Sequence, residues 1–221
     1  EGKNYAGNYV SDNKMRLEMA AEVLEDAYLG KSTADAKEIT IGVTSFADTL
    51  EPTEQYFSWV VSRYAIGECL TKFDENGEIV PCLAESWDVS EDGKVYTFHI
   101  RPGVLFSDGE KCDAYAIKAN FDAILENKDR HTWLEMMNLL VGVSAPDEDT
   151  FVIEMSEPYY PMLTELACIR PFAMISPNCM IDGSTMNGVN GYIGTGPYVL
   201  TDFVTDEYAV FERNENYWGE A

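Results

Sequence analysis

The sequence predicts a mixed α/β fold with α+β character in a chain of 221 residues. Short segments of alternating apolar residues are interspersed with longer amphipathic segments, and no strict βαβ alternation is present. Turn signals such as Asn-Gly and Asp-Gly separate them. A hydrophobic content of 46% with 24% charged residues predicts a folded chain with a substantial core and excludes full disorder. No apolar run approaches the ~18 residues of a membrane-spanning helix.

The chain divides into two parts near residue 38. In residues 1–38, Met15, Met19, Val23 and Leu24 recur at helical spacing, which predicts a helix that stops at Gly30. The polar residues 31–37 that follow have the composition of a linker. We therefore expect an N-terminal helix and linker over 1–38, and one larger unit over 39–221.

The larger unit reads as a succession of short elements. Asn76-Gly77 is a strong hairpin signal, and apolar residues recur at helical spacing from Ala114 to Glu126. Alternation predicts strands, and helical periodicity predicts helices. The expected strands are 39–43, 95–100, 150–155, 198–200 and 208–213, the last two as a hairpin; the expected helices are 56–70, 114–126, 133–140 and 161–167.

Charge and cysteine content narrow the function classes. The chain has 15 Lys+Arg against 39 Asp+Glu, a formal net charge of −24, so we expect no nucleic-acid partner and no adhesion to anionic lipid. The five cysteines form no C-x-x-C pair and no zinc-like spacing with histidine. We expect most of them to be buried as small apolar residues.

The sequence offers little for catalysis. Its only histidines are His99 and His131, and His99 alternates within an expected strand, so we assign it a structural role. No G-x-S-x-G, G-x-G-x-x-G or H-E-x-x-H pattern occurs. These absences make an enzyme a weak hypothesis, and we name no metal ligand.

Two basic sites are more informative. Arg130 and Trp133 are three residues apart, and on a helical turn they would share a face that grips a carboxylate and stacks on a planar group. Arg170 lies in an apolar neighbourhood between Leu166 and Met174, where an unpaired guanidinium would be costly. Its partner is either an internal Asp or Glu or the carboxylate of a ligand.

Several motifs, in order, resemble those of family 5 extracellular solute-binding proteins, the binding components of ABC importers for peptides and nickel. The resemblance covers roughly residues 39–221 and is greatest to the nickel-binding branch, through Arg130–Glu135, Tyr159-Tyr160-Pro161, Arg170-Pro171-Phe172 and Met186-Asn187-Gly188. The motifs shared with the whole family are Leu83–Trp87, Ser90–Lys94, Tyr96–Arg101, Phe106–Glu110, Gly194–Tyr198 and Arg213–Trp218.

The resemblance implies a type II periplasmic-binding-protein-like fold, of which residues 39–221 form the first lobe, incomplete and without the second. It implies that Arg170 grips a carboxylate of a nickel chelate, that Arg130 adds a second positive contact and that Trp133 lines the pocket. Tyr56, Trp59 and Val60 would line it from the first helix, with Val60 where the branch has a methionine. Since both walls are needed to bury a ligand, we expect this 221-residue chain alone to bind weakly.

The resemblance implies capture of a nickel chelate outside the cytoplasmic membrane and delivery to an ABC transporter permease, by a monomer. We therefore expect a binding protein that is not an enzyme and that needs no cofactor. The protein would be located in the periplasm, or at the cell surface as a lipoprotein, with the polar N-terminal segment as the tether to its anchor. One alternative stays in the family and binds di- or oligopeptides through their backbone groups and termini. Another, of a different class, is a signalling or interaction module that uses the fold without transport.

Overall fold

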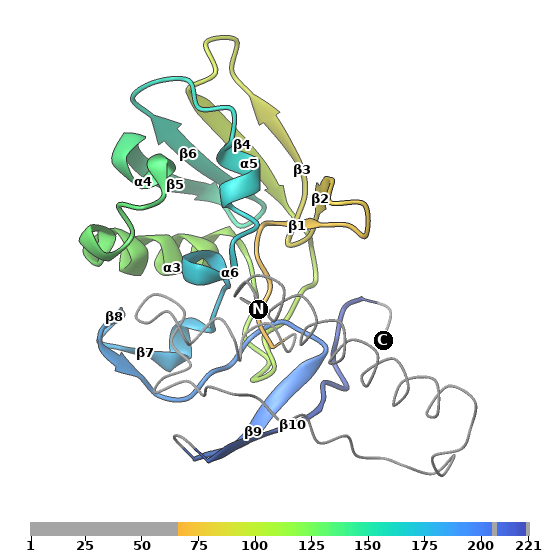
Figure 1. Ribbon diagram of the computed structural model, residues 1–221. Helices are drawn as coiled ribbons and strands as arrows, with labels where there is room; N and C mark the ends of the chain where they lie inside the picture. The colour runs from red at the N-terminus through yellow and green to blue at the C-terminus, as the bar shows by residue number, and fades with distance from the viewer. Residues whose placement is uncertain (1–65, 205–206, 220–221) are drawn as a thin grey trace, which may run out of the picture. The chain divides into compact units, whose positions relative to one another are not determined.

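A four-stranded antiparallel sheet forms the framework of the structure (Figure 1). The computed structural model describes residues 66–204 and 207–219, and the account below concerns these residues. The expected helix 15–29, the linker 31–37, the strand 39–43 and the first ten residues of the helix 56–70 lie outside the described residues.

The sheet has the strand order β3-β4-β6-β5, and every neighbouring pair is antiparallel. Phe98 and Phe151 are register partners on the two central strands, and both are completely buried. Alternate residues of these strands face the core, as the period of two predicts. The predicted strands 95–100 and 150–155 are therefore confirmed, whereas β5 was not predicted. The strands span Ala84–Val89 (β3), Val95–Ile100 (β4), Leu140–Asp147 (β5) and Thr150–Met155 (β6).

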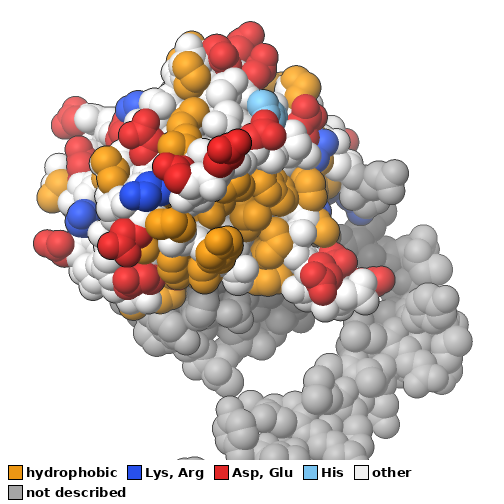
Figure 2. Space-filling view, turned by 90° about the horizontal axis from the view of Figure 1, so that it is seen from above, with side chains coloured by type: hydrophobic (Ala, Val, Ile, Leu, Met, Phe, Trp, Pro, Cys, Tyr) orange, Lys and Arg blue, Asp and Glu red, His pale blue; other side chains and the backbone are white. Residues whose placement is uncertain are grey.

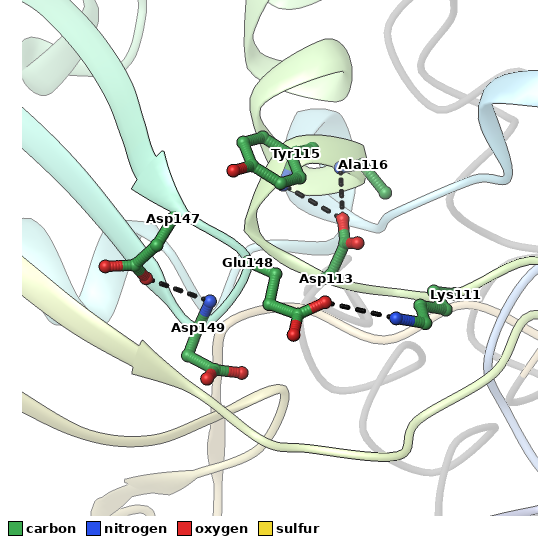
Figure 3. A network of polar contacts seen from close by, with 7 residues as sticks. All are labelled: Lys111, Asp113, Tyr115, Ala116, Asp147, Glu148 and Asp149. Carbon is green, nitrogen blue, oxygen red and sulfur yellow. Dashed lines mark hydrogen bonds and ion pairs between the residues drawn. The ribbon is translucent and has the colours of Figure 1, made fainter.

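Helix α3, Ala114–Glu126, packs against the sheet with the bounds that the sequence predicts (Figure 1). The Asp113 carboxylate caps it, because one oxygen accepts hydrogen bonds from the backbone N–H groups of Tyr115 and Ala116, each at 3.0 Å (Figure 3). Phe121 on its buried face lies 4.8 Å from the Phe151 ring of β6, centroid to centroid. This aromatic contact fixes the helix on the sheet.

Residues 66–70 are not helical, which corrects the last part of the predicted helix 56–70. Their backbone groups serve other segments: the Glu68 carbonyl accepts from the Met174 N–H at 2.9 Å, and the Ile66 carbonyl accepts from the Gly196 N–H at 3.2 Å. The apolar spacing of this stretch reflects burial between segments rather than one face of a helix. Tertiary hydrogen bonds thus replace the helical ones.

The other elements are short. The predicted hairpins at 74–78 and 198–213 are confirmed, and Gly77 adopts the positive φ of +81° that the first turn requires. The predicted helices 133–140 and 161–167 are present but shorter. These elements span Thr71–Phe73 (β1), Ile79–Pro81 (β2), Lys128–Arg130 (η1), Glu135–Leu139 (α4), Met162–Glu165 (α5), Ile169–Phe172 (α6), Pro177–Cys179 (η2), Met180–Ile181 (β7), Ser184–Val189 (β8), Tyr198–Val204 (β9) and Tyr208–Arg213 (β10).

Two clusters of buried side chains form the core. The larger lies between the sheet, α3, α5 and α6, and the smaller joins Ile66, Ile175 and Tyr192 to apolar side chains of β9 and β10. Figure 2 shows acidic side chains spread around an exposed hydrophobic area on one face, in keeping with the large negative charge. No helix in the described ranges is long and apolar enough to cross a membrane.

Candidate ligand-binding site

Arg170 lies in α6, which the core holds firmly. The backbone of Arg170 is extended inside this short element, and the Arg170–Pro171 peptide bond is cis. Phe172 is completely buried and stacks on Phe121 of α3 with ring centroids 5.6 Å apart. The neighbours that the sequence analysis singled out, Leu166 and Met174, are completely buried, whereas Arg170 itself is half-buried. The packing therefore places this guanidinium at the margin of the core.

Arg130 and Trp133 lie close together in the chain, where η1 is followed by the loop that leads to α4. Arg130 ends η1 and is exposed, and Trp133 lies in the following turn with 55% of its surface exposed. His131, which follows Arg130, and Leu134, which follows Trp133, are buried and anchor the loop. The predicted helical turn shared by Arg130 and Trp133 is not formed, because η1 ends at Arg130 and α4 begins only after Leu134. The loop still presents both side chains to the outside.

The remaining candidate residues, Tyr56, Trp59 and Val60, lie outside the described residues. Whether Arg170, Arg130 and Trp133 contact a ligand stays a prediction. Among the residues that the structure describes, no group of three or more His, Cys, Asp or Glu side chains has the arrangement of a metal site.

The Glu68 carboxylate, which sequence reasoning missed, joins two motifs that are far apart in the chain from it. Glu68 Oε2 accepts hydrogen bonds from the Thr195 hydroxyl and from the Trp218 indole N–H, each at 2.7 Å. Glu68 Oε1 accepts from the Tyr217 hydroxyl at 3.3 Å and from the Cys82 thiol at 3.8 Å. We call these five residues the Glu68 network. The network holds the Gly194–Tyr198 and Arg213–Trp218 motifs against the residues that precede β1. Thr195, Tyr217 and Trp218 therefore have a structural role in these motifs.

Burial and the Glu68 charge shape the acid–base properties of this network. Partial burial, the negative charge and the hydrogen bond of Glu68 together raise the pKa of Tyr217 to about 12. Burial and the same carboxylate raise the pKa of Cys82 to about 12. Both groups therefore stay protonated at neutral pH and act as donors. Arg101 also contacts two members of the Glu68 network. Its guanidinium carbon lies 4.6 Å from the Trp218 ring centroid, and its Nε donates to the Cys82 carbonyl at 3.0 Å.

The cysteines behave as the sequence predicts. Cys69, Cys82, Cys112 and Cys179 are buried, Cys168 is half-buried, and none of the five forms a disulfide. Burial raises the pKa of Cys69 and Cys112 well above that of an exposed thiol. These four buried side chains are therefore packing residues rather than reactive groups.

A second polar cluster lies at the turn between β5 and β6 (Figure 3). Glu148 pairs with Lys111 at 3.1 Å, and Asp147 accepts from the Asp149 backbone N–H at 3.1 Å. With the Asp113 cap, these contacts engage the Asp113 and Glu148 carboxylates beside a pocket lined by residues 100–105, 111–113, 148 and 149. His99 similarly pairs with Asp88 across β3 and β4 at 2.9 Å, a surface contact. These groups stabilise turns and strand pairs.

The fold defines a lobe of the type II periplasmic-binding-protein class, and comparison with known proteins identifies its family. The chain belongs to the bacterial extracellular solute-binding proteins, family 5, whose model matches residues 78–221. Membership and fold confirm the resemblance seen in the sequence.

Three relatives illustrate the match. The nickel-binding periplasmic protein of Escherichia coli is 48% identical over 153 residues, covering 69% of this chain and 29% of that protein. NikA from Brucella suis, solved in complex with Fe(III)-EDTA, superposes with a TM-score of 0.78 at 39% identity, covering 81% of this chain and 36% of that one. The glutathione-binding protein GsiB of Pectobacterium atrosepticum is 30% identical, covering 83% and 35%. The chain thus spans about a third of the length of these relatives.

Proposed function

We propose that the complete protein containing this chain is the binding component of an ABC importer that captures nickel as a small-molecule chelate. The observation that carries the proposal is the 48% identity to a nickel-binding periplasmic protein. The Brucella suis relative holds another metal chelate, Fe(III)-EDTA, which supports a chelate rather than a bare ion as ligand. The relatives are binding proteins, and we infer the same for this protein rather than an enzyme.

The described residues suit such a ligand. Exposed Arg130 and half-buried Arg170 offer cationic groups to the carboxylates of a chelator, in a chain with only 15 Lys+Arg. The exposed Trp133 ring offers a flat apolar surface on the same loop as Arg130. In the proposed mechanism a second lobe closes over this surface, and the closed shape is what the permease recognises. The protein would work as a monomer in the periplasm, or at the cell surface on a lipid anchor.

The proposal is tested by calorimetry on the complete protein with the nickel(II)–histidine complex, with nickel(II) chloride alone as a reference. Arg170→Ala should weaken binding by about a hundredfold or more, because a chelator carboxylate would lose its half-buried cationic partner. Arg213→Ala is the matched control, since Arg213 is exposed at the end of β10, and its Kd should stay within about twofold. Equal dissociation constants for wild type and Arg170→Ala would remove Arg170 from the site.

A peptide ligand is the second candidate, favoured by the 30% identity to a glutathione-binding protein. A peptide would use the same arginines for its terminal carboxylate and would need an acidic partner for its amine. Titration of the same protein with glutathione and with dipeptides separates the two. A peptide that binds more tightly than nickel–histidine would reassign the protein to peptide uptake.

A further inference from the structure

Glu165 makes hydrogen bonds to both segments that carry the candidate ligand residues, to one through its side chain and to the other through its backbone carbonyl. Glu165 is the last residue of α5 and is half-buried. Its Oε2 accepts a hydrogen bond from the backbone N–H of Met136 at 3.0 Å, in the first turn of α4. Its Oε1 accepts from the Tyr159 hydroxyl at 2.6 Å. One carboxylate therefore ties α5 to α4.

The Met136 N–H needs such a partner. The first amides of a helix have no acceptor within the helix, and α4 has Leu134 at its N-cap, whose side chain makes no capping hydrogen bond. Glu165 supplies the acceptor from another part of the chain, and a carboxylate at a helix start is also electrostatically favourable. Trp133 is three residues before Met136, so this bond fixes the end of the loop that carries it.

The backbone of Glu165 contacts the segment that carries Arg170. The Glu165 carbonyl accepts from the Cys168 N–H at 2.9 Å, and α6 with Arg170 begins directly after Cys168. The backbone of Glu165 is itself fixed by a bond from its N–H to the Pro161 carbonyl at 3.0 Å. Glu165 thus makes hydrogen bonds both to the end of the Trp133 loop and to the residue that precedes the Arg170 segment.

The sheet anchors this arrangement through tyrosine. The Tyr159 carbonyl accepts from the hydroxyl of Tyr96, a residue of β4, at 2.9 Å. Partial burial and the Glu165 contact raise the pKa of Tyr159 to about 12, so its hydroxyl remains a donor at neutral pH. A continuous series of hydrogen bonds therefore runs from Tyr96 through Tyr159 and Glu165 to Met136.

We propose that Glu165 is a positioning residue for ligand capture, which sets the spacing between Arg170 and the Arg130–Trp133 loop. The role rests on the proposed function, and Glu165 acts through these residues rather than by touching the ligand. Both of its oxygens are occupied by protein donors. A displacement of about 1 Å between groups that must grip one small ligand is enough to cost substantial affinity.

The first test compares three variants of the complete protein by calorimetry with nickel(II)–histidine. Glu165→Ala removes both bonds and should weaken binding by about tenfold. Glu165→Gln keeps an acceptor oxygen for Met136 and an amide that donates to Tyr159, so its Kd should stay within about twofold. Glu148→Ala, which loses only a surface ion pair with Lys111, should also stay within about twofold. Rescue by Gln separates positioning from a contribution of charge.

A second readout needs no ligand. In Glu165→Ala the Met136 amide should exchange with solvent deuterium about tenfold faster than in wild type, while Glu165→Gln should match wild type. Exchange at β4 should be the same in all variants, which shows that the fold is intact. If Glu165→Ala does not fold, Tyr159→Phe takes its place, with an expected loss of affinity of about threefold.

The outcomes separate the two proposals. Wild-type binding with equal affinity in Glu165→Ala, or with an unchanged Met136 exchange rate, would overturn the role of Glu165 and leave the nickel proposal standing. Equal weakening in Glu165→Ala and Glu165→Gln would also overturn it, because charge rather than placement would then matter. Wild-type protein that binds no nickel–histidine would overturn the nickel proposal and the positioning role together.

Discussion

The Asn120 side chain pairs with the backbone of Ile175 as a strand residue would. Asn120 Nδ2 donates to the Ile175 carbonyl at 2.8 Å, and the Ile175 N–H donates to Asn120 Oδ1 at 3.0 Å. Asn120 Nδ2 also donates to the Ala116 carbonyl at 2.9 Å, within α3. A buried amide thus joins α3 to the extended segment after α6, the element that carries Arg170.

Asn120→Ala should lower the free energy of unfolding by about 2–4 kcal/mol, because two buried backbone groups of Ile175 lose their partners. Urea unfolding followed by far-ultraviolet circular dichroism measures the change. Asp122→Ala, on the exposed side of the same helix, is the control and should cost less than about 1 kcal/mol. Equal stability of the two variants would show that the Asn120 bonds contribute nothing.

Glu68→Gln should destabilise the protein by about 1–3 kcal/mol, because an amide N–H would replace an oxygen that accepts from protein donors. With the Gln oxygen toward Thr195 and Trp218, the amide N–H group faces the Tyr217 hydroxyl and the Cys82 thiol, which must change from donors to acceptors. A thiol is a weak acceptor, and the bonds to a neutral amide lose the strength that the carboxylate charge gives them. The emission of Trp218 should shift to longer wavelength as its environment loosens. Glu85→Gln, an exposed change on β3, is the control. A Glu68→Gln protein as stable as this control would contradict the role of the network.

Stability should fall as pH rises above about 10, the ordinary pKa of tyrosine. Tyr217 has a pKa of about 12 in the folded protein, so between pH 10 and 12 the unfolded chain releases this proton while the folded protein keeps it. The free energy of unfolding therefore decreases across that window and is unaffected by Tyr217 below it. Tyr217→Phe should flatten the decrease in urea unfolding at pH 9 and 11. The same slope in both proteins would refute the assignment.

Gly194→Ala should be severely destabilising, at about 3 kcal/mol or more, because the added methyl would lie 1.7 Å from the Ile66 carbonyl oxygen. The obstacle is backbone and cannot rotate away. Gly142→Ala in β5 is the matched control, since nothing lies within 4 Å of its Cβ position, and it should change stability by less than about 1 kcal/mol. Comparable unfolding midpoints for the two variants would contradict this contact.

Local sequence signals predicted those elements whose stability is local. The apolar period of residues 114–126 and the alternation in 95–100 and 150–155 predicted the correct bounds. β5 was missed because it contains Gly142 and Pro146 and its register shifts twice against β6, so no regular alternation is present. Local signals were sufficient to predict a helix or strand wherever the burial of one of its faces determined its structure.

The candidate site was less accessible from the sequence for a physical reason. Arg130, Trp133 and Arg170 stand out by residue type, and the structure shows Arg130 and Trp133 exposed on one anchored loop. The supporting residues do not stand out, because Glu165 and Glu68 are two acids among 39, and their partners are far away in the chain. Only the three-dimensional structure brings such partners together.

The Glu68 network also dictates an order of events during synthesis. The bonds from Glu68 to Thr195, Tyr217 and Trp218 span 127, 149 and 150 residues. A nascent chain that has emerged only as far as β8 can already pair β3, β4, β5 and β6, but it still lacks every one of these three donors. We expect the central sheet to form early and this corner to close last, since contacts so far apart in the chain are slow to form.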